Sequence, residues 1–125
     1  MKKHVIQEAL KNCPGIIYYP DTNKLELVGR SIPENPEQIF RPLDEWITLH
    51  FEKNNRLDIN FQLEYINSGS SKYLFGLLKR LTDYWRSGKV VNMKWLYDED
   101  DEAILELGQH YRDTAGIPLR IKMIE

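Results

Sequence analysis

The sequence predicts an α/β domain with a mixed, largely parallel β-sheet, crossover helices and an N-terminal hairpin. Some segments alternate polar and apolar residues, as half-buried strands do. Between them lie segments whose apolar residues recur at helical spacing. Strands and helices in this order favour parallel pairing with right-handed crossovers. The 125 residues suit one domain over residues 1–125, and a hydrophobic fraction of 42% suits a folded chain.

The first strands are predicted as a hairpin. Residues 15–19 are rich in β-branched and aromatic side chains, Pro20–Asn23 is a turn sequence, and residues 24–29 alternate polar with apolar. The residues before Pro14 are ambiguous between a short strand and a loose helical turn.

A helix is predicted next. Asn35 is a suitable cap, Pro36 suits the first helical position, and the apolar residues up to Phe51 lie on one helical face. Pro42 removes a backbone donor inside this segment. We therefore expect a kink there, or a short turn into a second helix.

The second half of the chain alternates strands and helices. The predicted strands cover residues 57–65, 90–97 and 119–123. One helix covers residues 70–87, and another opens with the acidic run Asp98–Glu102 and ends at Gly116. The three tryptophans fall on predicted inner faces and are expected in the core: Trp46, Trp85 and Trp95.

Charge and composition narrow the class of protein. The net charge is -2 and the basic residues are scattered along the chain, so neither nucleic acid nor anionic lipid is an expected partner. No apolar run approaches the roughly 20 residues that span a bilayer, and no signal peptide is evident, so no membrane insertion is expected. Cys13 is the single cysteine, which favours a reducing, cytoplasmic location.

The turn after the predicted strand 57–65 carries three hydroxyls. It reads Asn67-Ser68-Gly69-Ser70-Ser71-Lys72. Free backbone amides and the helix dipole favour an anion at such a position, and a phosphate on Ser68 would be held there. Gly69 is expected to let the backbone bend so that this hydroxyl faces outward. The alternative is that Ser68 or Ser70 only caps the helix.

Three motifs resemble the SiaC family of bacterial regulatory phosphoproteins: Gly29–Asn35, Leu63–Tyr73 and Val91–Glu102. The resemblance extends from about Gly15 to the C-terminus. It implies a STAS-like sheet with helices, as in anti-sigma-factor antagonists.

The resemblance also implies a function. The best-known member of the family binds and activates a diguanylate cyclase, a serine/threonine kinase phosphorylates it, and a PP2C-type phosphatase reverses the modification. The family's phosphoacceptor is a threonine directly after the asparagine of this turn, and that place is Ser68 here. Gly69 stands where the family often has serine, so Ser70 and Ser71 are second choices. The phosphorylated form is expected to lose its partner.

The carboxyl ends of neighbouring parallel strands meet at one edge of a sheet, so residues from two junctions are expected to form the partner surface. Each of the aromatic ones is equally able to pack beside the sheet. These residues are Tyr65, Asn67, Gly69, Lys72, Tyr73, Tyr97 and Asp98.

No metal, cofactor or catalytic residues are expected. The run Asp98–Glu102 lacks the glycine and terminal glutamate of an EF-hand, so a solvated helix cap is the simpler interpretation. The three histidines lack the spacing of a zinc site and are expected on the surface or in ordinary packing: His4, His50 and His110. Cys13 has no nucleophile signature.

Two alternatives to a cyclase-binding phosphoprotein remain. One is a module like the anti-sigma-factor antagonists that engages a kinase or sigma-factor regulator. The other is a small serine-dependent hydrolase, which is disfavoured because the turn at Ser68 does not match Gly-x-Ser-x-Gly. Arg30 is expected in solvent, with neutralisation of a phosphate as a secondary role.

Overall fold

The computed structural model describes residues 2–31 and 35–124. Within them six strands and three helices follow one another, and a 3-10 turn at Pro20–Thr22 joins the second strand to the third. The elements are β1 (His4–Gln7), β2 (Gly15–Tyr19), β3 (Lys24–Ser31), α1 (Glu37–Lys53), β4 (Arg56–Ile66), α2 (Ser68–Arg86), β5 (Val90–Tyr97), α3 (Glu102–Ala115) and β6 (Leu119–Met123). Three residues of the first family motif, Ile32–Glu34, lie outside the described residues.

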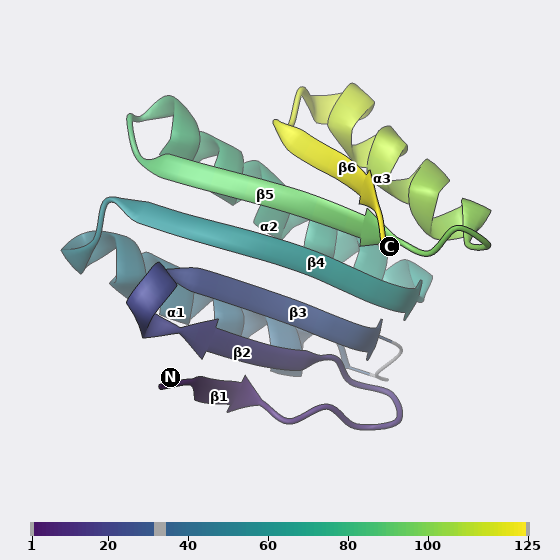
Figure 1. Ribbon diagram of the computed structural model, residues 1–125, viewed down its shortest axis with the longest axis horizontal. Coiled ribbons are helices and arrows are strands. Elements are labelled where there is room, and N and C mark those ends of the chain that lie inside the picture. Colours follow the sequence, from purple (N-terminus) through teal and green to yellow (C-terminus); the bar gives the residue numbers. More distant parts are fainter. Residues whose placement is uncertain (1, 32–34, 125) are drawn as a thin grey trace.

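One sheet contains all six of these strands, in the order β1-β2-β3-β4-β5-β6 (Figure 1). Strands β1, β2 and β3 pair antiparallel, and β3, β4, β5 and β6 pair parallel. The predicted fold class, a mixed and largely parallel sheet with crossover helices, is confirmed. The ambiguous N-terminal segment forms β1, which adds a third antiparallel strand to the predicted hairpin.

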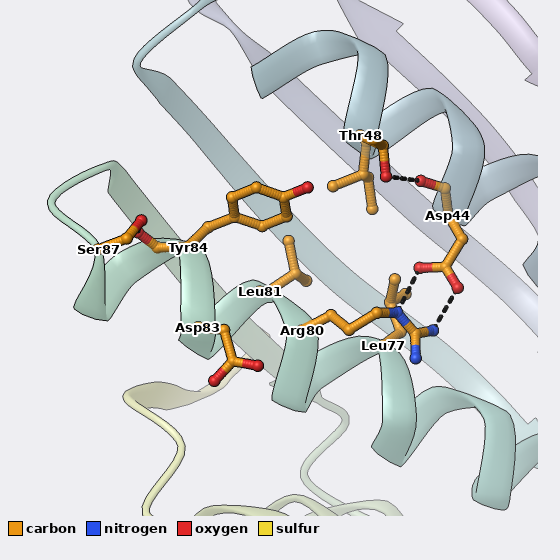
Figure 2. Close-up of a pocket in the computed structure, with 9 residues that line it drawn as sticks. Asp44, Thr48, Leu77, Arg80, Leu81, Asp83, Tyr84 and Ser87 are labelled. Atoms are coloured by element: carbon orange, nitrogen blue, oxygen red, sulfur yellow. Dashed lines mark hydrogen bonds and ion pairs between the residues drawn. The ribbon is translucent and has the colours of Figure 1, made fainter. Parts of the chain in front are cut away.

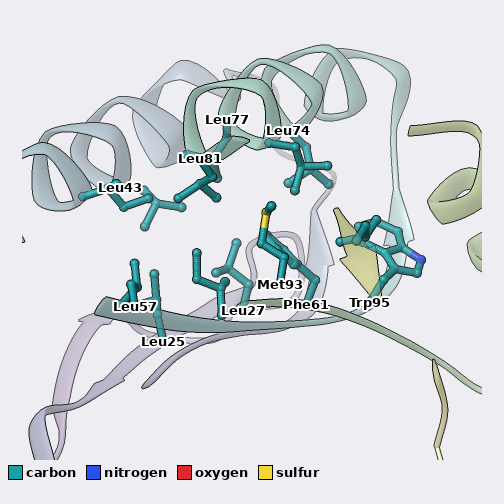
Figure 3. Close-up of a cluster of buried hydrophobic side chains, with 14 of the residues drawn as sticks. Leu25, Leu27, Leu43, Leu57, Phe61, Leu74, Leu77, Leu81, Met93 and Trp95 are labelled. Carbon is teal, nitrogen blue, oxygen red and sulfur yellow. The ribbon is translucent and has the colours of Figure 1, made fainter. Parts of the chain in front are cut away.

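The three helices lie on one face of the sheet, behind it in Figure 1. Alternation along the strands explains this layering. In β4 the buried residues Leu57, Ile59 and Phe61 face the helices, whereas Asp58 and Asn60 between them point to the opposite face. Figure 3 shows the resulting core, in which leucines of α1 and α2 interlock with side chains from the strands. The sheet therefore has a covered apolar face and an open polar face.

Helix α1 differs in two respects from its predicted form. It runs without a break from Glu37 to Lys53, so the expected alternative of a short turn into a second helix at Pro42 is wrong. Pro42 is an exposed residue, and so is Gln38, whose carbonyl loses its helical partner. Asn35 does not cap the helix with its side chain. Its backbone carbonyl instead accepts a hydrogen bond from the Gln38 amide at 3.2 Å.

The tryptophans divide between the core and the surface. Trp95 is buried and Trp46 is partly buried, but Trp85 is 45% exposed, so its predicted core position is wrong. The neighbouring ring of Tyr84 takes the inner place and stacks on Phe51 of α1, with ring centroids 4.4 Å apart.

Across the described ranges, no helix has both the length and the apolarity needed to cross a bilayer.

Candidate functional site

Asn67 fixes the point at which α2 begins. Its extended backbone makes it the N-cap, and its side-chain Oδ1 accepts a hydrogen bond from the Ser70 amide at 2.9 Å. Its backbone amide donates to the carbonyl of Ser31 at 3.0 Å, which ties the helix start to the end of β3. Ser68 is then the first helical residue. It is exposed, and its hydroxyl has no hydrogen-bond partner among the described residues.

The other two serines of the turn are held inside. Ser70 is fully buried, and its hydroxyl accepts a hydrogen bond from the Ser31 hydroxyl at 2.9 Å. The burial of that oxygen argues against Ser70, the second choice of phosphoacceptor. Ser71 is half-buried and shares a hydrogen bond with the phenol of Tyr111. The turn thus presents one free hydroxyl to solvent, that of Ser68.

Gly69 is exposed and lies beside the start of α1. Its backbone is helical and does not have a positive φ, so the expectation that glycine is needed for a bend is wrong. A Cβ added at this position would lie 3.4 Å from Cγ of Pro36. That distance is an ordinary van der Waals contact, so the packing of the two helix starts leaves room for a Cβ here.

Tyr65 and Tyr73 lie on opposite sides of the sheet. The pairing of β3 with β4 shifts by one residue between Gly29 and Arg30, which places Arg30 opposite Tyr65. The guanidinium of Arg30 lies 5.9 Å from the centre of the Tyr65 ring. Tyr73 instead stacks on Phe40 of α1 at 6.0 Å.

Lys72 and Tyr73, two more of the predicted partner residues, lie one helical turn beyond Ser68 and Gly69 on α2. Both are exposed and line a shallow hollow of about 300 Å³ on the outer face of the helix, together with Gly76 and Arg80. Of the predicted partner residues, Gly69, Lys72 and Tyr73 therefore form a continuous surface with Ser68.

The second junction has a different construction from the one predicted. Helix α3 begins at Glu102, and the Oδ1 of Asp101 caps it by accepting the Ile104 amide at 3.1 Å. The run from Asp98 is therefore mostly a loop before the helix. Tyr97 is partly buried against the core at the end of β5, and Asp98 is exposed directly after it. Both lie at the carboxyl-end edge of the parallel strands, where α2 also begins.

An apolar groove between α1 and α2 lies away from Ser68. It has a volume of about 360 Å³ and is lined by Ile47, Leu77, Leu81 and Tyr84 among others (Figure 2). An ion pair between Arg80 and Asp44 crosses one end, with Nε to Oδ1 at 2.7 Å. The groove extends toward the C-terminal end of α2, so it does not belong to the Ser68 site.

His50 on α1 has structural contacts rather than a place beside Ser68. His50 is buried, and its Nε2 donates a hydrogen bond to the backbone carbonyl of Arg56 at 2.7 Å. That bond requires the proton on Nε2 and gives the ring a packing role beside Trp46 and Tyr18. Among the described residues, no group of three or more histidine, cysteine or acidic side chains is arranged to hold a metal ion.

Comparison with known proteins identifies the family. The profile of the SiaC family of regulatory phosphoproteins matches residues 7–124. The chain belongs to this family. The resemblance found in the three sequence motifs is thereby confirmed, and the protein is a regulatory phosphoprotein by family.

Solved structures of SiaC from Pseudomonas aeruginosa share the fold. One of these structures shows SiaC in complex with the diguanylate cyclase SiaD, of which SiaC is the activator. That SiaC chain is 26% identical to this chain, with a TM-score of 0.84 over 93% of this chain and 96% of that one. Apo-SiaC is 25% identical and matches with a TM-score of 0.85 over 98% and 99%. An uncharacterized protein of the same species is 28% identical over 100 residues, which is 79% of each chain.

Proposed function

We propose that this SiaC-family protein binds and regulates a diguanylate cyclase, and that phosphorylation of Ser68 abolishes that binding. The main support for the proposal is the hydroxyl of Ser68 at the first position of α2, which is exposed and has no hydrogen-bond partner among the described residues. It lies between Asn67, which caps the helix, and Ser70, which is buried. A relative with the same fold, SiaC, forms a complex with the cyclase SiaD. Ser68 also directly follows the asparagine of the motif, where the family resemblance places the phosphoacceptor.

The position explains how a phosphate changes binding without unfolding the protein. A phosphoserine carries about -1.5 to -2 charges at neutral pH. At the start of α2 that charge is favoured by the helix dipole, so the modified chain keeps its fold. A partner that covers Ser68 together with Lys72 and Tyr73 would have to desolvate the dianion, which opposes close docking.

The same proposal assigns the chemistry of modification to other proteins. The Ser68 hydroxyl makes no hydrogen bond to a histidine or carboxylate of the described chain, so nothing in its surroundings activates it as a nucleophile. A serine/threonine kinase adds the phosphate, a PP2C-type phosphatase removes it, and the protein itself is not an enzyme. An anti-sigma-antagonist-like role would use the same hydroxyl with a different partner.

The test combines phosphorylation with partner binding. The purified chain is incubated with ATP and its cognate kinase, and peptide mass spectrometry should locate one phosphate on Ser68. Ser68→Ala should bind the cyclase but resist modification, and Ser68→Glu should bind at least about tenfold more weakly. Ser87→Ala removes a hydroxyl next to the far end of α2 and is the matched control. Tight cyclase binding by Ser68→Glu, or a phosphate on Ser71, would refute the proposal.

A further inference from the structure

Cations that are scattered along the sequence come together on the open face of the sheet. The register places Lys94 of β5 directly opposite Arg120 of β6, and the row continues through Asn60 of β4 to Glu26 of β3. Two adjoining hollows, of about 370 and 270 Å³, lie on this face, and Lys94 and Arg120 line both of them. We call this region the basic trough; its cations are Lys24, Arg56, Lys94, Arg120 and Lys122.

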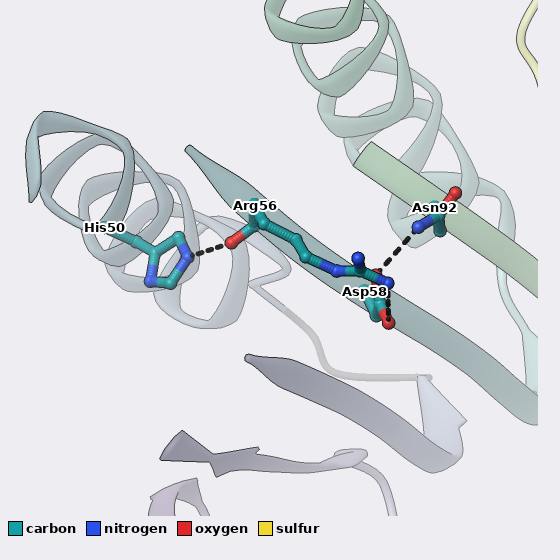
Figure 4. Close-up of polar contacts among 4 residues, drawn as sticks. All are labelled: His50, Arg56, Asp58 and Asn92. Carbon is teal, nitrogen blue, oxygen red and sulfur yellow. Dashed lines mark hydrogen bonds and ion pairs between the residues drawn. The ribbon is translucent and has the colours of Figure 1, made fainter. Parts of the chain in front are cut away.

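Only part of this charge is neutralised within the protein. Arg56 pairs with Asp58 at 3.2 Å, as Figure 4 shows, and Asn92 of β5 donates to the same carboxylate at 2.9 Å. Lys24 lies 3.7 Å from a carboxylate oxygen of Glu26. The remaining three cations of the trough lie beyond ion-pair distance of every described carboxylate, although the charge of Lys94 still acts on Asp58: Lys94, Arg120 and Lys122. A positive surface therefore stands on a protein whose net charge is -2.

The pair at the centre of the trough costs the fold stability. Like charges directly opposite each other on neighbouring strands repel. Cations on an edge strand also discourage sheet-to-sheet association, and this accounts for Arg120 and Lys122 on β6. It does not account for Lys94, because β5 is an inner strand. An anion that binds above Lys94 and Arg120 explains why both are charged.

The width and the lining of the trough indicate what that anion is. From β3 to β6 the cations span three strand spacings, or about 14 Å, which exceeds the size of one phosphate group. The residues that line the two hollows include no aromatic ring on which a nucleobase would stack. They offer cations and the side-chain amides of Asn60 and Asn92, which suit a row of carboxylates.

We propose that the basic trough docks an acidic segment of a protein partner. This surface lies on the face of the sheet opposite α2, so it is a second interface, separate from the one that contains Ser68. Binding at the trough does not require Ser68 to be unmodified. The two surfaces therefore allow two proteins to be held at once.

The test uses the full chain, labelled with ¹⁵N and titrated with a decaglutamate peptide at low salt. Peptide-induced shifts should map to β4, β5 and β6 on the open face. Lys94→Gln/Arg120→Gln should weaken binding at least about tenfold, since each charge-assisted contact contributes about that factor. Lys3→Gln/Lys53→Gln removes the same charge from exposed positions and should change affinity less than about twofold.

Three results would overturn the proposal. One is unchanged peptide binding by Lys94→Gln/Arg120→Gln, and another is a map of shifts confined to the helical face. The third is tighter binding of inorganic triphosphate than of decaglutamate at the same site, which would assign the trough to a small phosphate-bearing ligand. The double variant should also unfold at the same or a higher temperature than wild type, because it relieves like-charge repulsion. A lower unfolding temperature would show that the pair has a structural role and would equally overturn the proposal.

Discussion

Replacing Gly108 by alanine should destabilise the protein, although alanine is normally the better helix residue. Gly108 is a buried residue of α3 that packs against the indole of Trp95 on β5. A Cβ at this position would lie 2.5 Å from Nε1 and 2.9 Å from Cγ of that ring. Trp95 is 1% exposed and donates a hydrogen bond to the carbonyl of Ile104 at 2.8 Å, so it has no room to retreat.

The size of the effect follows from three contributions. Alanine in place of glycine favours a helix by about 1 kcal/mol. Forcing one extra methyl group into a packed interior costs about 1–3 kcal/mol. Displacing the indole also weakens its bond to Ile104, which costs about 1 kcal/mol. The net expectation for Gly108→Ala is a loss of about 1–3 kcal/mol in the free energy of unfolding.

Urea unfolding measures this change, and Gly76→Ala supplies the control. Gly76 lies in the interior of α2, where a new Cβ would lie 3.4 Å from a guanidinium nitrogen of Arg80, an ordinary van der Waals contact. That variant should gain up to about 1 kcal/mol, the opposite sign. In a Trp95→Phe background Gly108→Ala should cost less, because the smaller ring leaves space. Equal or greater stability of Gly108→Ala in the wild-type background would refute this account of the contact.

Two further substitutions test polar contacts. Ser70→Ala leaves the buried Ser31 hydroxyl without its acceptor and should lower the free energy of unfolding in urea by about 1–3 kcal/mol. Removing the hydroxyls of Ser31 and Ser70 together should cost less than the single change. Equal costs would contradict this prediction. Burial raises the pKa of Asp58, but the hydrogen bonds from Asn92 and Arg56 and the charges of Arg56 and Lys94 outweigh it and hold that pKa below its usual value. The ionised Asp58 therefore stabilises the fold above its unfolded pKa, and this stabilisation is lost as pH falls through the folded pKa. The difference in unfolding free energy between wild type and Asp58→Asn should shrink from pH 6 toward pH 3. A difference that does not depend on pH would contradict this prediction.

The sheet was predictable from the sequence because alternation in β4 and β5 is strict. The alternating hydrophobic pattern predicts that Leu57 and Ile59 are buried, and it also predicts that both lie on the same face of the sheet. The residue pattern also located the turn at Asn67–Lys72, and the resemblance then selected Ser68 within it. The individual burial of the three serines was not predictable, because successive helical residues point about 100° apart and the start of α2 depends on the Asn67 cap. The predicted start at Ser70 was two residues late.

The basic trough could not be predicted from the sequence either. Its cations lie far apart along the chain, and the scattered arrangement was interpreted as the absence of a basic surface. Only the register of the parallel strands, in which Lys94 meets Arg120, brings them together. The exposure of Trp85 has a similar cause: Tyr84 and Trp85 both lie near the inner stripe of α2, and the position of Phe51 on α1 decides which ring is covered.

The sheet is arranged in the order in which the ribosome makes it. Each strand after β1 pairs with the strand synthesised just before it, so every new segment finds its neighbour already present. Pairing between consecutive strands costs less loop-closure entropy than pairing between strands far apart in the chain. The nascent chain can therefore add strands to a growing edge during translation. Strand β6 completes the face that Arg120 shares with Lys94 only after the other five described strands have been made.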